Sequence, residues 1–316
     1  PHERLSPRAD TVASRMAVFR RLKHPSDTDS MFGPIRILVM PIRSLIQPVV
    51  QGLGDVEPLV FTVGEALPLD EAAKRLIENA YTRVDLVMDR GEFAVRGGIL
   101  DVFPPTAPHP VRIEFFGDEI DTIKEFHASD QRTYGDGLKT IWATACRELQ
   151  LTDAVRTRAK ALVGSIPNAE DMLESIANAI PVEGMESLMP ALVDHLEPVG
   201  SMLPKHAVIL LSDPEKLRRS AEDLAKTANE FLAAWHVAAS GHGAGAPISF
   251  DEASFLDYAE TISSLEYSEH PVIRLTSFGV DTTLTGHVQL DAQNPAEFRG
   301  DEAKASQGIE GLLDAG

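Results

Sequence analysis

Residues 90–125 hold the densest run of strand and turn signals in the chain. Aromatic and β-branched side chains, which favour extended backbone, recur there in short stretches. Gly97-Gly98 interrupts the first stretch, and Gly117-Asp118 is typical of a hairpin turn. Pro104-Pro105 ends the second stretch, because proline has no N–H to donate to a strand ladder. The run therefore predicts four short strands joined by tight turns in an antiparallel sheet.

The alternation along the third of these strands predicts which side chains it exposes. Apolar residues occupy every second position from Val111 to Phe115, so the positions between them share the opposite face. That face carries Arg112, Glu114 and Phe116. An exposed phenylalanine beside arginines resembles a protein-binding hot spot. A solvated sheet face with weak surface ion pairs explains the same pattern, and both interpretations stay open on the pattern alone.

Two motifs in this run resemble the family of transcription-repair coupling factors. They read Gly-Glu-Phe-Ala-Val-Arg-Gly-Gly-Ile-Leu-Asp-Val-Phe-Pro over residues 91–104 and Pro-Val-Arg-Ile-Glu-Phe-Phe-Gly-Asp-Glu-Ile-Asp over residues 110–121. The opening residues 1–12 and Asp130-Gln-Arg-Thr133 fit the same family. The similarity is specific over residues 1–143 and looser to residue 265. It points to the family's N-terminal module, which is itself similar to the excinuclease protein UvrB.

The resemblance implies a function in transcription-coupled nucleotide excision repair. The module would recruit the excinuclease protein UvrA to lesions where RNA polymerase has stalled. A distant C-terminal domain of the intact protein is expected to mask the contact surface, and RNA polymerase, DNA and the ATP-dependent translocase motor are expected to involve other domains. The residues implied for the contact with UvrA are Arg96, Arg112 and Phe116, with Glu114 expected to orient the arginines and Glu119 and Asp121 at the rim.

Two apolar runs outside this region predict buried strands of a parallel sheet, namely Ile35–Met40 and His206–Leu211. They bracket residues 56–143, where residues 69–80 have the spacing of an amphipathic helix. We therefore expect an α/β fold in which an α+β domain, an antiparallel sheet plus a helix, is inserted into a split domain.

The expected boundaries follow from the same pattern. Residues 1–55 and 144–265 would form the split α/β domain, and residues 56–143 the inserted domain that binds UvrA. Residues 266–316 would be a linker or the edge of a next domain. The resemblance adds that the split domain is a degenerate helicase-like parallel-sheet domain.

Composition narrows the class of protein. The chain has 29 Lys and Arg against 48 Asp and Glu, a formal net charge of −19, so phosphate backbones should repel it unless it has a local basic patch. Cys146 is the only cysteine, which excludes an intramolecular disulfide and suits a reducing cytoplasm. No apolar run approaches the roughly 20 residues that cross a bilayer, so we expect a cytoplasmic protein with no membrane contact. Because it starts at Pro1, we expect a fragment of a longer protein.

The motifs of common enzymes are missing from the sequence. There is no Gly-x-x-x-x-Gly-Lys-Ser/Thr loop to hold phosphates, no Gly-x-Ser-x-Gly and no His-Glu-x-x-His, and the 10 histidines are scattered. We therefore expect an interaction module without catalytic residues, ATPase activity, cofactor or metal. Two alternatives remain: a degenerate helicase-like piece that still binds nucleotide or DNA, and a purely structural spacer.

Overall fold

The computed structural model describes residues 7–26, 33–166, 169–240, 255–268, 270–276, 288 and 302–314. The chain divides into two compact units, Pro1–Leu275 and Thr276–Gly316. The second unit contributes one described helix, α10 (Glu302–Asp314). Much of the stretch at residues 266–316, expected to be a linker or the edge of a next domain, lies outside the described residues, namely 269, 277–287, 289–301 and 315–316.

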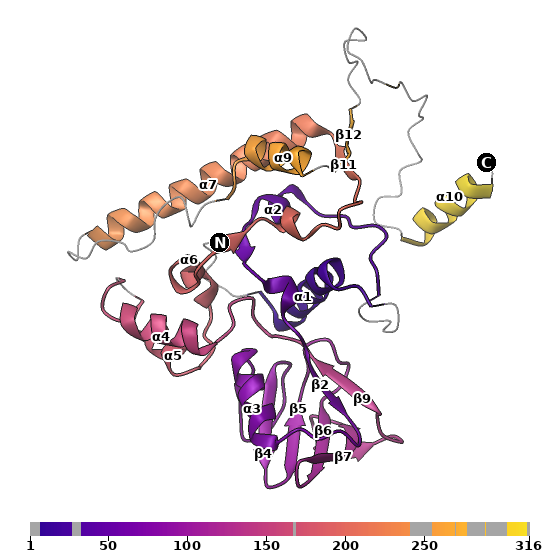
Figure 1. The fold of residues 1–316 in the computed structure, drawn as a ribbon, viewed down its shortest axis with the longest axis vertical. Coiled ribbons are helices and arrows are strands. Elements are labelled where there is room, and N and C mark those ends of the chain that lie inside the picture. Colours follow the sequence, from indigo (N-terminus) through magenta and orange to yellow (C-terminus); the bar gives the residue numbers. More distant parts are fainter. Residues whose placement is uncertain are drawn as a thin grey trace. The chain divides into compact units, whose positions relative to one another are not determined.

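A six-stranded sheet in the first unit confirms the strands predicted from the run at residues 90–125 (Figure 1). Its strands follow one another in chain order, antiparallel except for the parallel pair β3–β4. The bounds are β3 (Thr82–Arg83), β4 (Glu92–Arg96), β5 (Ile99–Val102), β6 (Val111–Phe116), β7 (Glu119–Phe126) and β8 (Thr133–Tyr134). The glycines of both predicted turns, Gly97 and Gly117, have positive φ angles of 60° and 64°.

Helix α3 (Leu69–Glu78) covers one face of this sheet, as its apolar spacing predicts (Figure 1). Ala72 and Leu76 of the helix are fully buried in one core with side chains of β4, β5, β6 and β7. An antiparallel ribbon of β2 (Leu59–Thr62) and β9 (Thr140–Ala143) completes that core. Burying a leucine or phenylalanine side chain contributes about 1.5–3 kcal/mol, so this core is a firm support for the opposite face of the sheet.

The rest of the first unit is mostly helical, with two short two-stranded sheets. Strand β1 pairs antiparallel with β10, and β11 pairs parallel with β12. The bounds are α1 (Ala9–Lys23), α2 (Ile42–Ile46), β1 (Val49–Val50), α4 (Asp153–Leu162), α5 (Glu170–Ala177), α6 (Met189–Leu192), β10 (Leu196–Glu197), β11 (Ile209–Ser212), α7 (Pro214–Ser240), α9 (Tyr258–Tyr267) and β12 (Val272–Leu275), with 3-10 turns at Leu53–Asp55, Met185–Leu188 and Val199–Met202.

The prediction of a buried parallel sheet is wrong for the first apolar run and only partly right for the second. Residues 35–40 form no strand, and the side chains of Ile37 and Val39 are 84% and 89% exposed. The second run does form β11, but Leu210 is exposed and β12 is the only partner strand within the described residues. Apolar composition favours burial without choosing a strand partner. The fold is therefore a mixed α/β architecture around a mixed six-stranded sheet, and a helicase-like parallel sheet is not seen in the described residues.

Two glycines with positive φ allow packing to be separated from backbone strain. A Cβ at Gly91 (φ +86°) would lie 3.1 Å from the buried Cys146 Sγ, whereas a Cβ at Gly97 (φ +60°) meets nothing within 4 Å. We expect Gly97→Ala to lower the free energy of unfolding by about 1 kcal/mol, the cost of a left-handed alanine. Gly91→Ala should cost about 1–3 kcal/mol more through overpacking. Urea unfolding with unchanged m-values would measure both losses of unfolding free energy. Equal losses in the two variants would show that the Cys146 sulfur moves away from the added methyl group at no cost.

Candidate protein-binding surface

The face of the six-stranded sheet opposite α3 carries the residues that the sequence analysis singled out. On β6, Val111 and Ile113 are buried against the core, and Arg112, Glu114 and Phe116 point to the other side, as the alternation predicts. The register extends this side across the sheet, because Arg96 pairs with Ile99, Ile99 with Glu114, and Asp101 with Arg112. We call the set Arg96, Ile99, Asp101, Arg112, Glu114 and Phe116 the outer face.

A buried carboxylate organises both arginines of the outer face. Asp101 is 0% exposed. Arg112 donates to it through Nε at 2.7 Å (Oδ1) and Nη2 at 2.9 Å (Oδ2), and Arg96 donates through Nη2 to Oδ2 at 2.5 Å. The two-point contact with Arg112 matches the planar fork of a guanidinium, which is the strongest arrangement for such a pair. The structure therefore brings Arg96 and Arg112 together on one acceptor.

Asp101 is not among the site residues predicted from the sequence, although its position in the chain indicates a paired carboxylate. Asp101 lies between Leu100 and Val102 in an apolar strand, and an unpaired carboxylate there would be costly. The residue expected to orient the arginines was Glu114. The hydrogen bonds from Arg112 to Asp101 are the main cause of the raised pKa of Arg112, and burial opposes that rise. Glu114 is exposed and contributes a smaller Coulomb attraction in the same direction as the hydrogen bonds.

Arg112 also contacts two residues other than Asp101. Its Nη1 donates to the Gln131 carbonyl at 3.3 Å, and its guanidinium lies over the Phe126 ring, 5.0 Å from the ring centre. Gln131 has a φ of 62°, and its side-chain amide donates to the Ala128 carbonyl at 2.8 Å and the Val87 carbonyl at 3.1 Å. The motif Asp130-Gln-Arg-Thr133 thus braces Arg112, whose side chain is only 19% exposed.

Three side chains of the outer face are exposed to solvent, those of Arg96, Glu114 and Phe116. The Arg96 side chain is 48% exposed, and within the described residues Asp101 is its one hydrogen-bond partner. Phe116 is 84% exposed and follows Glu114 on the same side of β6. Glu119, which pairs with Phe116, and Asp121 are also exposed, at the start of β7. Of the three residues implied for the direct contact, Arg96 and Phe116 are therefore accessible, and Arg112 is mostly enclosed.

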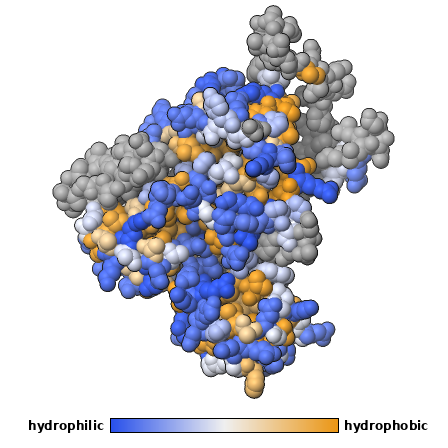
Figure 2. Space-filling model, in the orientation of Figure 1, coloured by the Kyte–Doolittle hydropathy of each residue, from blue (hydrophilic) through white to orange (hydrophobic). Residues whose placement is uncertain are grey.

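Phe116 differs from other strongly exposed apolar residues in its position on the outer face and not in its degree of exposure, because Ile37 and Val39 are 84% and 89% exposed as well. Figure 2 shows apolar and hydrophilic residues side by side over the part of the molecule that holds the six-stranded sheet, at the lower end of the view. Scattered apolar exposure of that kind is normal for a folded protein. Phe116 lies on the same side of the sheet as Arg96, and aromatic rings and arginines are enriched at protein-binding hot spots, which makes Phe116 a candidate contact residue.

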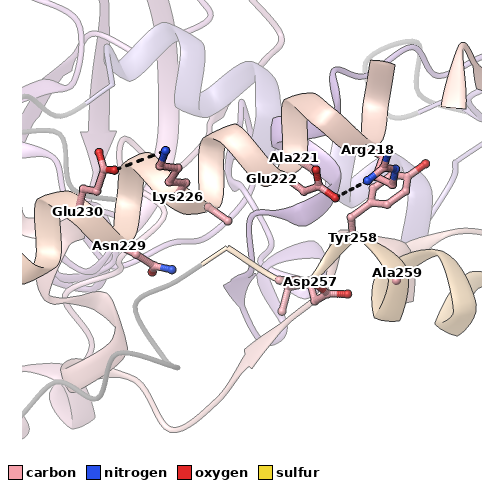
Figure 3. A pocket seen from close by; sticks show the side chains of 11 residues that line it. Arg218, Ala221, Glu222, Lys226, Asn229, Glu230, Asp257, Tyr258 and Ala259 are labelled. Carbon is pink, nitrogen blue, oxygen red and sulfur yellow. Dashed lines mark hydrogen bonds and ion pairs between the residues drawn. The ribbon is translucent and has the colours of Figure 1, made fainter. Parts of the chain in front are cut away.

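An open hollow lies between α7 and the start of α9. Its volume is about 660 Å³. Figure 3 shows that four of its charged residues pair along α7 itself, Arg218 with Glu222 and Lys226 with Glu230. Such pairs four residues apart are ordinary features of a solvated helix face. The fifth charged residue of the hollow, Asp257, caps α9 by accepting from the Glu260 N–H at 2.9 Å.

The described part of the chain contains neither a metal site nor a membrane helix. No group of three or more His, Cys, Asp and Glu side chains there is placed to hold a metal ion. None of the helices in those residues combines the length and the hydropathy needed to cross a bilayer.

Comparison with known proteins relates this sheet to one family. Residues 59–142 match the family model described as the UvrB interaction domain. The transcription-repair-coupling factor of Mycobacterium bovis is 42% identical over 315 residues, which is 95% of this chain and 25% of that protein. The corresponding factors of Myxococcus xanthus and Bacillus subtilis are 33% identical over 71% and 30% identical over 70% of this chain.

The matched region includes every residue of the outer face, together with α3, β2 and all of β9 except Ala143. The chain spans about a quarter of the length of the mycobacterial relative and about a fifth of the other two. A sustained 42% identity along nearly the whole chain, joined to a match with the interaction domain at the sheet, shows that this chain belongs to the transcription-repair-coupling factor family and corresponds to its N-terminal region.

Proposed function

We propose that this chain recruits the excinuclease protein UvrA to lesions at stalled RNA polymerase, as the N-terminal module of a coupling factor in transcription-coupled nucleotide excision repair. The observation that carries the proposal is the outer face, where a nearly fully exposed Phe116 lies on the same side of the sheet as Arg96 and its buried partner Asp101. The match of residues 59–142 to an interaction domain supports a contact within the domain that holds this face.

The chemistry of the outer face suits a protein partner with an acidic group beside an apolar hollow. Burying an aromatic side chain contributes about 1.5–3 kcal/mol, and a hydrogen bond to a charged group contributes a similar amount. A few such residues carry most of the binding free energy in protein interfaces. The net charge of −19 argues against a phosphate backbone as the main ligand.

Further parts of the proposal rest on family resemblance. The longer protein would mask the outer face with its C-terminal domain, and would contact RNA polymerase and DNA through other domains. The helicase-like origin of the split α/β part, the absence of ATPase activity in this chain and a cytoplasmic location belong to the same proposal.

Binding to purified UvrA tests the proposal directly. We expect Phe116→Ala and Arg96→Ala each to weaken binding about tenfold or more, because each removes an exposed group suited to a hot spot. Lys74→Ala is the matched charge control, since Lys74 is exposed on α3 at the opposite face. Leu210→Ala is the apolar control, an exposed residue on another sheet. Titration calorimetry measures all four. If Phe116→Ala and Arg96→Ala bind as the controls do, the outer face is not the contact.

Arg112 variants should affect folding before they affect binding. We expect Arg112→Met to lower the free energy of unfolding by about 3–5 kcal/mol, because a buried carboxylate loses its two-point partner. Arg96→Met should cost about 1 kcal/mol or less, since Arg96 is half exposed and Asp101 keeps its contacts with Arg112. Urea unfolding of both variants gives the comparison. Equal losses of unfolding free energy in the two variants would mean that either arginine alone stabilises the Asp101 carboxylate equally well.

A nucleotide titration separates the proposal from the degenerate helicase alternative. We expect the midpoint of thermal unfolding to stay unchanged at millimolar ATP, because the sequence has no glycine-rich phosphate loop with its lysine. A ligand that binds the folded state raises this midpoint as its concentration exceeds its dissociation constant. A clear rise with ATP, absent with an equal ionic strength of sodium chloride, would favour nucleotide binding instead.

A further inference from the structure

The two arginines around Asp101 differ in the donors they have left for a partner. A guanidinium has five N–H groups. Arg112 directs three of its nitrogens inward, Nε and Nη2 to Asp101 and Nη1 to the Gln131 carbonyl, with its flat face on Phe126. Arg96 directs one nitrogen to Asp101, within the described residues, and its side chain is 48% exposed. The free donors of the pair are therefore mainly those of Arg96.

The two arginines also differ in how firmly the fold holds them. Arg112 sits in the middle of the sheet, on β6, and is enclosed by the 128–131 segment. Arg96 is the last residue of β4, next to the Gly97-Gly98 turn. An arginine at such a place has many rotamers, and holding it in one of them before binding lowers the entropic cost of association. The contact with the fully buried Asp101 supplies that restraint.

We propose that Asp101 is a positioning residue, which Arg112 locks in place and which in turn holds Arg96 ready for one carboxylate of the partner. Arg96 keeps unused N–H donors at the surface and can bind one partner carboxylate. The two arginines of the outer face are balanced by Asp101 and Glu114, so the face has no net positive charge to attract a phosphate-rich surface. Ile99 lies between Arg96 and Glu114 in the register, and Phe116 follows on the same side. The partner group is thus a carboxylate next to an apolar hollow for Phe116. Only this partner chemistry rests on the proposed function.

Asp101→Asn gives a test in which positioning of Arg96 and net charge alone predict opposite changes in the affinity for UvrA. The substitution keeps the shape of the side chain and removes a negative charge from the outer face. If charge alone mattered, an acidic partner would bind more tightly to the variant. Positioning predicts that UvrA binds the variant about tenfold more weakly, because Arg96 is no longer held. Unchanged or tighter binding by the variant would overturn the proposal.

A double-mutant cycle with Arg96→Ala separates positioning from a general defect of folding. If Asp101 acts through Arg96, then Asp101→Asn should weaken binding very little once Arg96 is alanine, and the two effects are not additive. A loss of the same size in both backgrounds would show that Asp101 acts through the fold, against the proposal. Circular dichroism at the binding temperature confirms that each variant is folded.

A measurement without any partner keeps this inference separate from the proposed function. Side-chain NMR of the uniformly ¹⁵N-labelled chain reports how freely each guanidinium rotates. We expect slow rotation and a distinct Nε–H signal for Arg96 in the parent chain, assigned by its loss in Arg96→Lys, and fast rotation in Asp101→Asn. Fast rotation in the parent would overturn the positioning role even if UvrA binds. Slow rotation without any binding would overturn the proposed function and leave the positioning role intact.

Discussion

The buried contact between Asp101 and two arginines is the interaction on which the candidate surface depends. A carboxylate with no exposure to solvent is stable only when its charge is paired and its oxygens are hydrogen-bonded, and here both oxygens are used. The same contact joins β4, β5 and β6 from the side opposite the core. It also leaves Arg96, rather than Arg112, as the arginine that faces solvent.

The apolar core behind the sheet makes this arrangement possible. Leu100, Ile113 and Ile123 are fully or almost fully buried on the α3 side, so the strands cannot shift register without moving them. On the other side, Ala94 and Phe126 join Val87 and Phe103 in a second, smaller cluster. The outer face is therefore enclosed at its centre, where Arg112 lies over the buried Phe126, and accessible at the hairpin end, where Phe116 is exposed.

Sequence reasoning succeeded where the information was local. Strands of alternating apolar residues, glycine turns with positive φ and an amphipathic helix all depend on neighbours in the chain, and β4–β7 and α3 appear where they were predicted. It failed at Ile35–Met40, where apolar composition predicted a buried strand and the structure shows exposed Ile37 and Val39. Strand pairing is a long-range choice that composition does not specify. The assignment of domain boundaries stays a prediction.

The sequence by itself determined which face of β6 is exposed, because the two-residue period of a strand leaves no alternative once Val111 and Ile113 are buried. It also contained the motifs by which the family was recognised. Only the tertiary structure decided the roles of the two arginines. Asp101 lies 5 residues from Arg96 and 11 from Arg112, and only the pairing of three strands brings its carboxylate between them. A charge network of this kind depends on strand register and burial, which arise when the whole sheet has formed.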